Sequence, residues 1–205
     1  MIIKVKLKNF LNYYNSLSIN SLIRLLVLKF YSTFSFGLFK RLKAYFYFGS
    51  SAVNVQRNVA IKGFCKNIEV GEDIIFYSNC IVELQRDANL KIGSHVIFSY
   101  GSVLSCSKSI EIGKDVQIGE YTSIRDTTHD YTDYGQPMMN NSDISLPIVI
   151  GNNVWIGRNC LIMPGTVIED GVVIGANSLV KGTLKRDTIY GGNPVQEIRQ
   201  RKKLV

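Results

Sequence analysis

The chain has 205 residues, a length that suits one domain with a modest extension. Its net charge of +8 comes from one end, because residues 1–48 contain eight basic residues and no acidic one, while the rest of the chain contains sixteen of each sign. This balance argues against a nucleic-acid-binding domain, and we expect no nucleic-acid partner. The four cysteines lie far apart without a C-x-x-C pair, which favours a reduced, cytoplasmic protein over a disulfide framework.

Residues 1–48 form a basic, apolar N-terminal segment, and we expect residues 21–48 to be helical. The apolar run 30–39 is about half as long as a bilayer requires, and no signal peptide is expected before it. Two interpretations stay open. The segment is either a helical cap over the edge of the following domain, or a segment that lies on anionic lipid at the inner face of the cytoplasmic membrane.

A six-residue repeat organises residues 49–183. An aliphatic residue recurs at every sixth position, and a small or β-branched residue stands four places after it. In the clearest stretch the aliphatic positions are Ile150, Ile156, Ile162, Ile168, Ile174 and Val180. This period fits neither a helix nor an alternating strand, but it fits a solenoid whose coils have three flat sides. Cys80 and Cys160 fall on the inward small positions, where cysteine acts as a small hydrophobe.

The repeat is interrupted once at length, over residues 125–147, and we expect this insertion to form an extruded loop. It contains His129, with Asp126 and Asp130 beside it as the nearest carboxylates that could orient the ring. An imidazole there is suited to general base catalysis, although an ordinary surface histidine is an equal alternative. The other histidine, His95, occupies an outward position and is expected to be a solvated coil residue. Two histidines are too few for a three-imidazole zinc site, so we predict no metal.

The repeat ends near residue 183, and residues 184–205 are expected to form a tail with a short basic helix over residues 197–203. The tail begins with a turn-rich stretch, G-G-N-P, before that helix.

Several motifs together resemble the hexapeptide-repeat acyltransferases: the hexads, the histidine in the insertion, N-N-V-W-I-G, I-G-A-N-S and G-G-N-P-V-Q-E-I-R. The likeness covers roughly residues 53–200 and is closest to the galactoside and maltose acetyltransferases and to bacterial polysaccharide O-acetyltransferases. It implies an all-β, left-handed parallel β-helix, a homotrimer with an active site in each cleft between subunits, and acetyl-CoA as the acyl donor.

The resemblance also implies roles for individual residues. The catalytic base falls on His129, and Ser99 takes the place of an asparagine that lies near the acetyl group in the sugar acetyltransferases, which puts the same substrate in doubt. Trp155, at an outward position, either packs between subunits or stacks on CoA or a sugar. The family's CoA contacts fall on Arg158, Ala176, Lys181, Gly182, Gln196 and Arg199. Lys181 replaces a neutral residue of the family and Gln196 replaces a basic one. The positive charge that meets CoA is therefore expected at a different position than in the family.

These observations predict an acetyl-CoA-dependent O-acetyltransferase that acts on a sugar hydroxyl of a bacterial surface polysaccharide, such as capsule, O-antigen or sialic acid polymer, or of its precursor. Two alternatives remain: N-acetylation of an amino sugar nucleotide, and a non-catalytic β-helix scaffold. The sequence names neither the glycan nor the hydroxyl, and fold alone does not decide among the three.

Overall fold

The structure is a computed structural model that describes residues 36–202. The chain divides into two compact units, Met1–Lys40 and Arg41–Val205. All of the solenoid belongs to the second unit, and most of the first lies outside the described residues. No helix between residues 36 and 202 is both long enough and apolar enough to span a bilayer.

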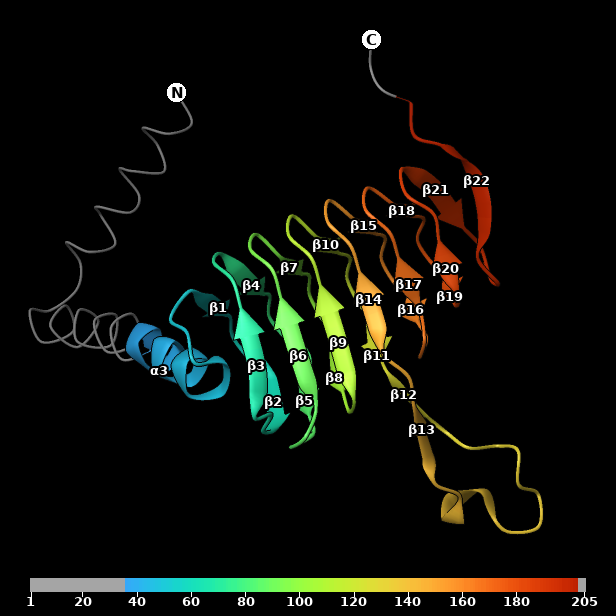
Figure 1. Cartoon of the computed structure of the whole chain (residues 1–205). Coiled ribbons are helices and arrows are strands. Elements are labelled where there is room, and N and C mark those ends of the chain that lie inside the picture. The colour runs from blue at the N-terminus through green and yellow to red at the C-terminus, as the bar shows by residue number, and fades with distance from the viewer. Residues whose placement is uncertain (1–35, 203–205) are drawn as a thin grey trace, which may run out of the picture. The chain divides into compact units, whose positions relative to one another are not determined.

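The second unit is a parallel β-solenoid with three sheets, which we call faces A, B and C (Figure 1). Face A contains β1 (Val53–Val55), β4 (Ile74–Phe76), β7 (Ile97–Phe98), β10 (Gln117–Ile118), β15 (Trp155–Ile156), β18 (Val173–Ile174), β21 (Thr188–Gly191) and β22 (Gln196–Gln200). Face B contains β2 (Ala60–Gly63), β5 (Ile81–Leu84), β8 (Val103–Cys106), β11 (Ser123–Arg125), β16 (Leu161–Ile162) and β19 (Leu179–Val180). Face C contains β3 (Asn67–Val70), β6 (Asn89–Ile92), β9 (Ser109–Ile112), β14 (Ile148–Ile150), β17 (Val167–Ile168) and β20 (Thr183–Leu184).

The chain passes from face A to B to C in each coil, so the turns form three edges, which we call AB, BC and CA. Successive coils pair in register, as Phe98, Ile118, Ile156 and Ile174 do along face A. The six predicted aliphatic positions from Ile150 to Val180 are buried, and none of these side chains is more than 1% exposed. The predicted fold class, a solenoid of hexapeptide repeats, is therefore confirmed.

The small inward positions are also buried as expected, and they include Cys80 and Cys160. Burial raises the pKa of both thiols, and the free cysteines form no disulfide. Glycine at edge AB allows the coils to stack closely. A Cβ built on Gly119 would lie 2.5 Å from the backbone nitrogen of Arg158, and one on Gly157 would lie 2.6 Å from that of Ala176.

Helix α3 (Phe36–Phe48) precedes the first coil and lies in the region that we expected to be helical. In its second half, Ala44 and Phe48 are buried, and the Phe48 ring stacks on Phe76 at a centroid distance of 5.5 Å. The Lys43 ammonium donates a hydrogen bond to the carbonyl of Val59 at 2.6 Å. This half of the helix therefore packs on the solenoid, whereas the expectation for residues 1–35 lies outside the described residues.

The prediction of a short C-terminal helix is wrong. Residues 196–200 form β22, which pairs antiparallel with β21. The turn 192–195 reverses the chain, and β21 also extends the coils beyond the expected boundary at residue 183. Because β21 would otherwise present an open edge of N–H and C=O groups, the tail satisfies these groups better as a strand than as a short isolated helix.

Candidate active site

The expected insertion is a β-hairpin at edge BC, between β11 on face B and β14 on face C (Figure 1). Its strands are β12 (Thr127–His129) and β13 (Asp143–Ser145), and a 3-10 turn, η2 (Met138–Asn140), lies near its tip. The antiparallel register places His129 opposite Asp143. The hairpin thus carries its histidine outward from the coils.

His129 forms a pair with Asp143, whose Oδ1 lies 2.7 Å from the ring Nδ1. The histidine side chain is 74% exposed and the aspartate 56%, so the ring is open to a ligand from solvent. An ionised carboxylate can only accept a hydrogen bond, so Nδ1 carries the hydrogen and Nε2 keeps its lone pair. This arrangement suits a general base, since one nitrogen is held and the other is free to take a proton.

Neither of the two carboxylates expected to orient this ring contacts it. Asp126 is fully buried and accepts backbone N–H bonds from Ser107, Lys108 and Ser109 at 2.7–2.8 Å. Asp130 instead closes a local turn, and hydrogen bonds from the side chain and backbone of Thr132 lower its pKa. Asp126 therefore anchors the hairpin to the coil below it, while Asp143 performs the orienting role.

A groove along edge AB and face A gathers four of the predicted site residues. We call it the edge-AB groove, and its volume is about 480 Å³. Ser99, Trp155, Arg158 and Ala176 all line it. The remaining lining residues are mostly apolar or glycine and are Ile97, Gln117, Ile118, Gly119, Glu120, Gly157, Val173, Ile174, Gly175, Ile189, Tyr190 and Ile198.

The groove offers an apolar wall and free polar groups. Trp155 is 57% exposed and stands on β15 between Gln117 and Val173 of the neighbouring strands. The Ser99 hydroxyl makes no hydrogen bond to any residue between 36 and 202. Ala176 adds only a methyl group, so backbone atoms are accessible beside it. Such a surface suits a long, partly apolar ligand with a few polar anchors.

The other predicted CoA contacts do not line this groove. Lys181 and Gly182 lie at edge BC, between β19 and β20, on the same edge as His129. Gln196 and Arg199 are on β22, whose Ile198 does line the groove. The predicted residues are therefore divided between two edges of the solenoid.

A second groove, which the sequence reasoning missed, follows face B below the hairpin. We call it the face-B groove, and its volume is about 390 Å³. Its lining is mostly polar and consists of Lys62, Gly63, Glu83, Leu84, Gln85, Ser105, Ser107, Arg125, Thr127 and Asp143. The sequence feature that could have revealed this groove is a set of polar residues at equivalent outward positions of β2, β5, β8 and β11.

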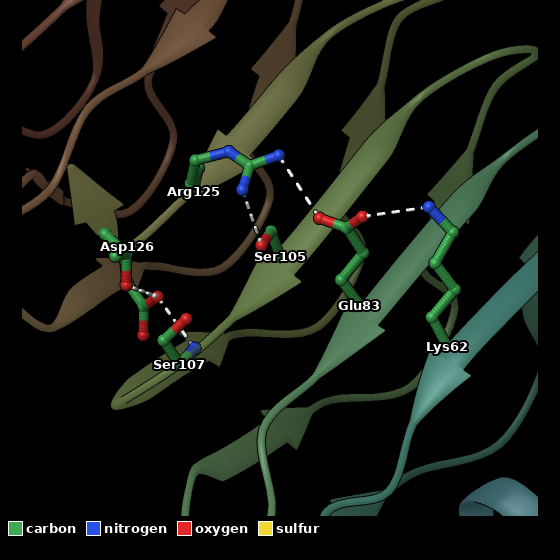
Figure 2. Close-up of polar contacts among 7 residues, drawn as sticks. Lys62, Glu83, Ser105, Ser107, Arg125 and Asp126 are labelled. Atoms are coloured by element: carbon green, nitrogen blue, oxygen red, sulfur yellow. Dashed lines mark hydrogen bonds and ion pairs between the residues drawn. The ribbon is translucent and has the colours of Figure 1, made fainter. Parts of the chain in front are cut away.

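Figure 2 shows the polar side chains of this groove side by side along face B. Glu83 lies between two cations, with Lys62 Nζ at 3.3 Å and Arg125 Nη2 at 3.2 Å. The Arg125 guanidinium also donates to the Ser105 hydroxyl at 3.1 Å. Partial burial raises the pKa of Glu83, but the hydrogen bond from Lys62, the Arg125 charge and a hydrogen bond from Ser105 outweigh it and hold that pKa below its ordinary value. Glu83 is therefore ionised at neutral pH.

The family described as bacterial transferase hexapeptide (six repeats) matches residues 147–182, the stretch that carries the clearest hexads. The chain therefore carries the repeat of the hexapeptide transferases over these residues. Within residues 36–202, no three or more His, Cys, Asp or Glu side chains form a group that could hold a metal ion. The expectation of no metal stays a prediction.

The chain is similar to two acetyltransferases of Escherichia coli K12. WbbJ, whose name assigns it to lipopolysaccharide biosynthesis as an O-acetyl transferase, is 28% identical over 67% of this chain and 90% of its own length. The galactoside O-acetyltransferase is 32% identical over 55% of each protein. The chain thus spans nearly all of WbbJ but about half of the galactoside enzyme.

Among solved structures, the chain is similar to a variant of AntD, an N-acyltransferase from Bacillus cereus in complex with dTDP and coenzyme A. The TM-score is 0.64 at 25% identity, and the match covers 74% of this chain and 82% of AntD. The relatives thus include both O-acetyl and N-acyl transferases, and all transfer acyl groups.

Proposed function

We infer that this protein is an acetyl-CoA-dependent O-acetyltransferase that acts on a sugar hydroxyl of a bacterial surface polysaccharide or its precursor. One observation carries this proposal: an exposed imidazole held by a carboxylate at 2.7 Å, on a hairpin outside the coils. The name of WbbJ supports an O-acetyl product on a surface glycan, because this chain spans most of that protein. The coenzyme A complex of AntD supports the donor.

In the proposed reaction, His129 Nε2 accepts the proton of the acceptor hydroxyl while Asp143 holds Nδ1–H. The hydroxyl oxygen attacks the thioester carbon of acetyl-CoA and forms the C–O bond of a tetrahedral intermediate. The C–S bond then breaks, and the imidazolium returns its proton to the leaving thiolate. The products are the O-acetyl sugar and free CoA. Asp143 stabilises the imidazolium while it exists.

The edge-AB groove is the proposed site for the donor. Trp155 and the apolar strand residues would pack on the pantetheine arm, with Ala176 admitting it close to the backbone. The Ser99 hydroxyl is free to donate to the thioester oxygen as negative charge develops. Arg158 at edge AB and Arg199 on β22 would supply the charge for the CoA phosphates, and Gln196 lies on β22 with Arg199.

The division of the residues between two edges supports a homotrimer. His129, Lys181 and Gly182 lie at edge BC, so one chain does not place them beside its own edge-AB groove. In a three-fold ring with edge CA of each copy toward the axis, the hairpin at edge BC of one copy would reach toward the edge-AB groove of the next and complete the site. Face B, which lies opposite edge CA, would then point to solvent.

The catalytic proposal is tested by release of thiol from acetyl-CoA in the presence of carbohydrate acceptors. His129→Ala should lower turnover by about a hundred- to ten-thousand-fold, the usual contribution of a general base. Asp143→Asn should cost only about tenfold, because a carboxylate near a solvent-exposed imidazolium stabilises it by roughly 1–1.5 kcal/mol in water. His95→Ala is the matched control. Its ring is also exposed and contacts Asp115 at 3.0 Å, yet it lies at edge CA.

Near wild-type turnover by a folded His129→Ala protein would refute the mechanism, and a loss in His95→Ala as large as in His129→Ala would show a structural cause. A second candidate function is N-acylation of an amino sugar nucleotide, which the likeness to AntD favours. Acetyl transfer to a nucleotide-linked amino sugar, with no transfer to sugars that lack an amine, would select this alternative.

The N-terminal segment supports a further partner, an anionic membrane surface. Leu42, Tyr45 and Phe46 on α3 are 58–73% exposed, and the preceding residues carry most of the segment's positive charge. Exposed aromatic and aliphatic side chains beside basic residues favour peripheral contact with acidic lipid. Such contact would place the enzyme where surface glycans are assembled.

A further inference from the structure

The face-B groove is a polar channel that the proposed reaction uses only at one end, through Asp143. It is lined from four successive coils, through Lys62 on β2, Glu83 on β5, Ser105 on β8 and Arg125 on β11. At the end nearest the hairpin, it is lined by Thr127 and Asp143. Because Asp143 is itself bonded to His129, one end of the channel adjoins the catalytic base.

The direction of the groove sets the length of a ligand that fills it. Adjacent strands are about 4.8 Å apart, so the four coils from β11 to β2 extend over roughly 14 Å. A pyranose ring spans little more than one strand spacing. A single sugar placed at His129 would therefore leave the contacts at Glu83 and Lys62 unused, whereas a chain of linked sugars would follow the column of polar groups.

The chemistry of the groove suits hydroxyl groups. Two of the five N–H groups of Arg125 donate to Glu83 and Ser105, which fixes the guanidinium and leaves three N–H donors. Ionised Glu83 offers acceptor lone pairs between two cations, and Ser105 and Ser107 add hydroxyls. The charges alternate along the groove, so it is not a general anion site. A rigid array of alternating donors and acceptors matches the donors and acceptors on a sugar chain.

The groove also stays accessible in the proposed assembly. With edge CA toward the three-fold axis, the opposite face of each coil, face B, points to solvent. A long acceptor could therefore lie across this face from outside the trimer and reach the active site at the hairpin. This step rests on the proposed function.

We propose that the face-B groove binds an oligosaccharide acceptor, with the reacting sugar at His129 and the following sugars along Arg125, Glu83 and Lys62. The enzyme then acts on an assembled glycan chain, or on its lipid-linked repeating unit, and not on a free monosaccharide. The reaction that supplies its substrate is a glycosyl transfer that has already joined several sugars.

The test uses the full-length protein and acetyl-CoA, with acceptors prepared as monosaccharide, disaccharide and tetrasaccharide fragments of several capsular and O-antigen glycans, together with nucleotide-linked sugars. In the glycan series that reacts best, we expect the tetrasaccharide to have a KM about tenfold below that of the monosaccharide, with similar kcat. Contacts to the distant sugars contribute equally to binding in the ground state and in the transition state, so they change KM and leave kcat the same.

Two variants and one control locate the effect. Arg125→Ala should raise the KM of the disaccharide and tetrasaccharide by about tenfold, the effect of a lost charged hydrogen bond at a half-exposed site. Lys62→Ala lies at the far end, so it should raise only the KM of the tetrasaccharide. Lys91→Ala is the control and should change the KM of neither acceptor. The Lys91 side chain is 62% exposed, close to the 66% of Lys62, but it pairs with Glu69 on face C.

The outcomes separate the two proposals. Equal KM values for monosaccharide and tetrasaccharide would overturn the proposal that the face-B groove binds the acceptor, and so would equal effects of Lys62→Ala and Lys91→Ala. Transfer that depends on His129 would still support the proposed acetyltransferase activity in either case. Transfer to nucleotide-linked sugars alone would also overturn the groove proposal. Absence of transfer to any carbohydrate by the folded protein would refute both.

Discussion

The hairpin that carries His129 depends on one buried carboxylate, Asp126. Its Oδ1 accepts from the backbone of Ser107 at 2.8 Å, and its Oδ2 accepts from Lys108 at 2.7 Å and from Ser109 at 2.8 Å. Hydrogen bonds to a charged group each contribute about 1.5–3 kcal/mol. The Thr127 hydroxyl also donates to Oδ1, at 3.2 Å. Water can reach a turn at the coil edge, so Asp126→Ala should lower the free energy of unfolding by about 4 kcal/mol, less than the sum of these bonds.

Asp126→Asn gives a graded test of the same reasoning. An amide oxygen in the place of Oδ2 keeps the bonds from Lys108 and Ser109, but its NH₂ group then faces the N–H of Ser107. One bond and the negative charge are lost, so the cost should be about 2 kcal/mol, half that of alanine. Because β12 begins at the next residue, Thr127, both variants should also reduce turnover.

Urea unfolding at a fixed protomer concentration measures the free energies, since the stability of an oligomer depends on concentration. Amide hydrogen exchange adds a local readout at residues 107–109, where protection should fall in the order wild type, Asn, Ala. Asp130→Ala is the control, because the carboxylate of this aspartate in the same hairpin bonds only to Thr132 of its own turn. A loss of stability in Asp126→Ala no greater than in Asp130→Ala would refute the anchoring role.

Two other predictions concern titration and lipid. Burial, with smaller effects of Asp126 and Cys65, raises the pKa of Cys106 to about 12. An unfolded thiol ionises near pH 9 and the folded one keeps its proton, so the free energy of unfolding should fall between about pH 9 and pH 12, by at most about 1.4 kcal/mol per pH unit for this thiol. Cys106→Ala should flatten that slope, and an unchanged slope would contradict the assignment. The protein should also sediment with vesicles that contain acidic lipid at low salt and less at high salt. Sedimentation unaffected by deletion of residues 1–35 would exclude their contribution.

The hexads predicted most of the fold because each coil repeats the same local requirement. The inward positions at Ile156 and Cys160, for example, are set by the space inside one coil and do not depend on distant contacts. The C-terminal strand was not predicted because its structure depends on the unpaired edge of β21, a property of the finished solenoid. The short basic sequence of residues 197–203 has one large hydrophobic residue, Ile198, and little preference of its own for helix or strand.

Part of the candidate site was predictable for the same reason. His129 could be singled out because it lies in the only long interruption of the repeat. Asp143 was missed because its contact arises from cross-strand register within the hairpin, and no periodicity in residues 130–142 fixes that register. The face-B groove was missed because Lys62 and Arg125 are 63 positions apart in sequence and become neighbours of Glu83 only when the coils stack.

The hairpin leaves the solenoid at edge BC, and the chain then resumes in register, with Ile148 beside Ile110 and Ile150 beside Ile112. Residues 127–145 can therefore change in length or composition without shifting the following coils, while Asp126 keeps its bonds to the preceding coil. The proposed base and part of the proposed acceptor groove lie on this segment, while the proposed donor groove belongs to the coils. Relatives can diverge in acceptor by exchanging one segment, and the same exchange offers a direct route to engineering acceptor choice on a constant scaffold.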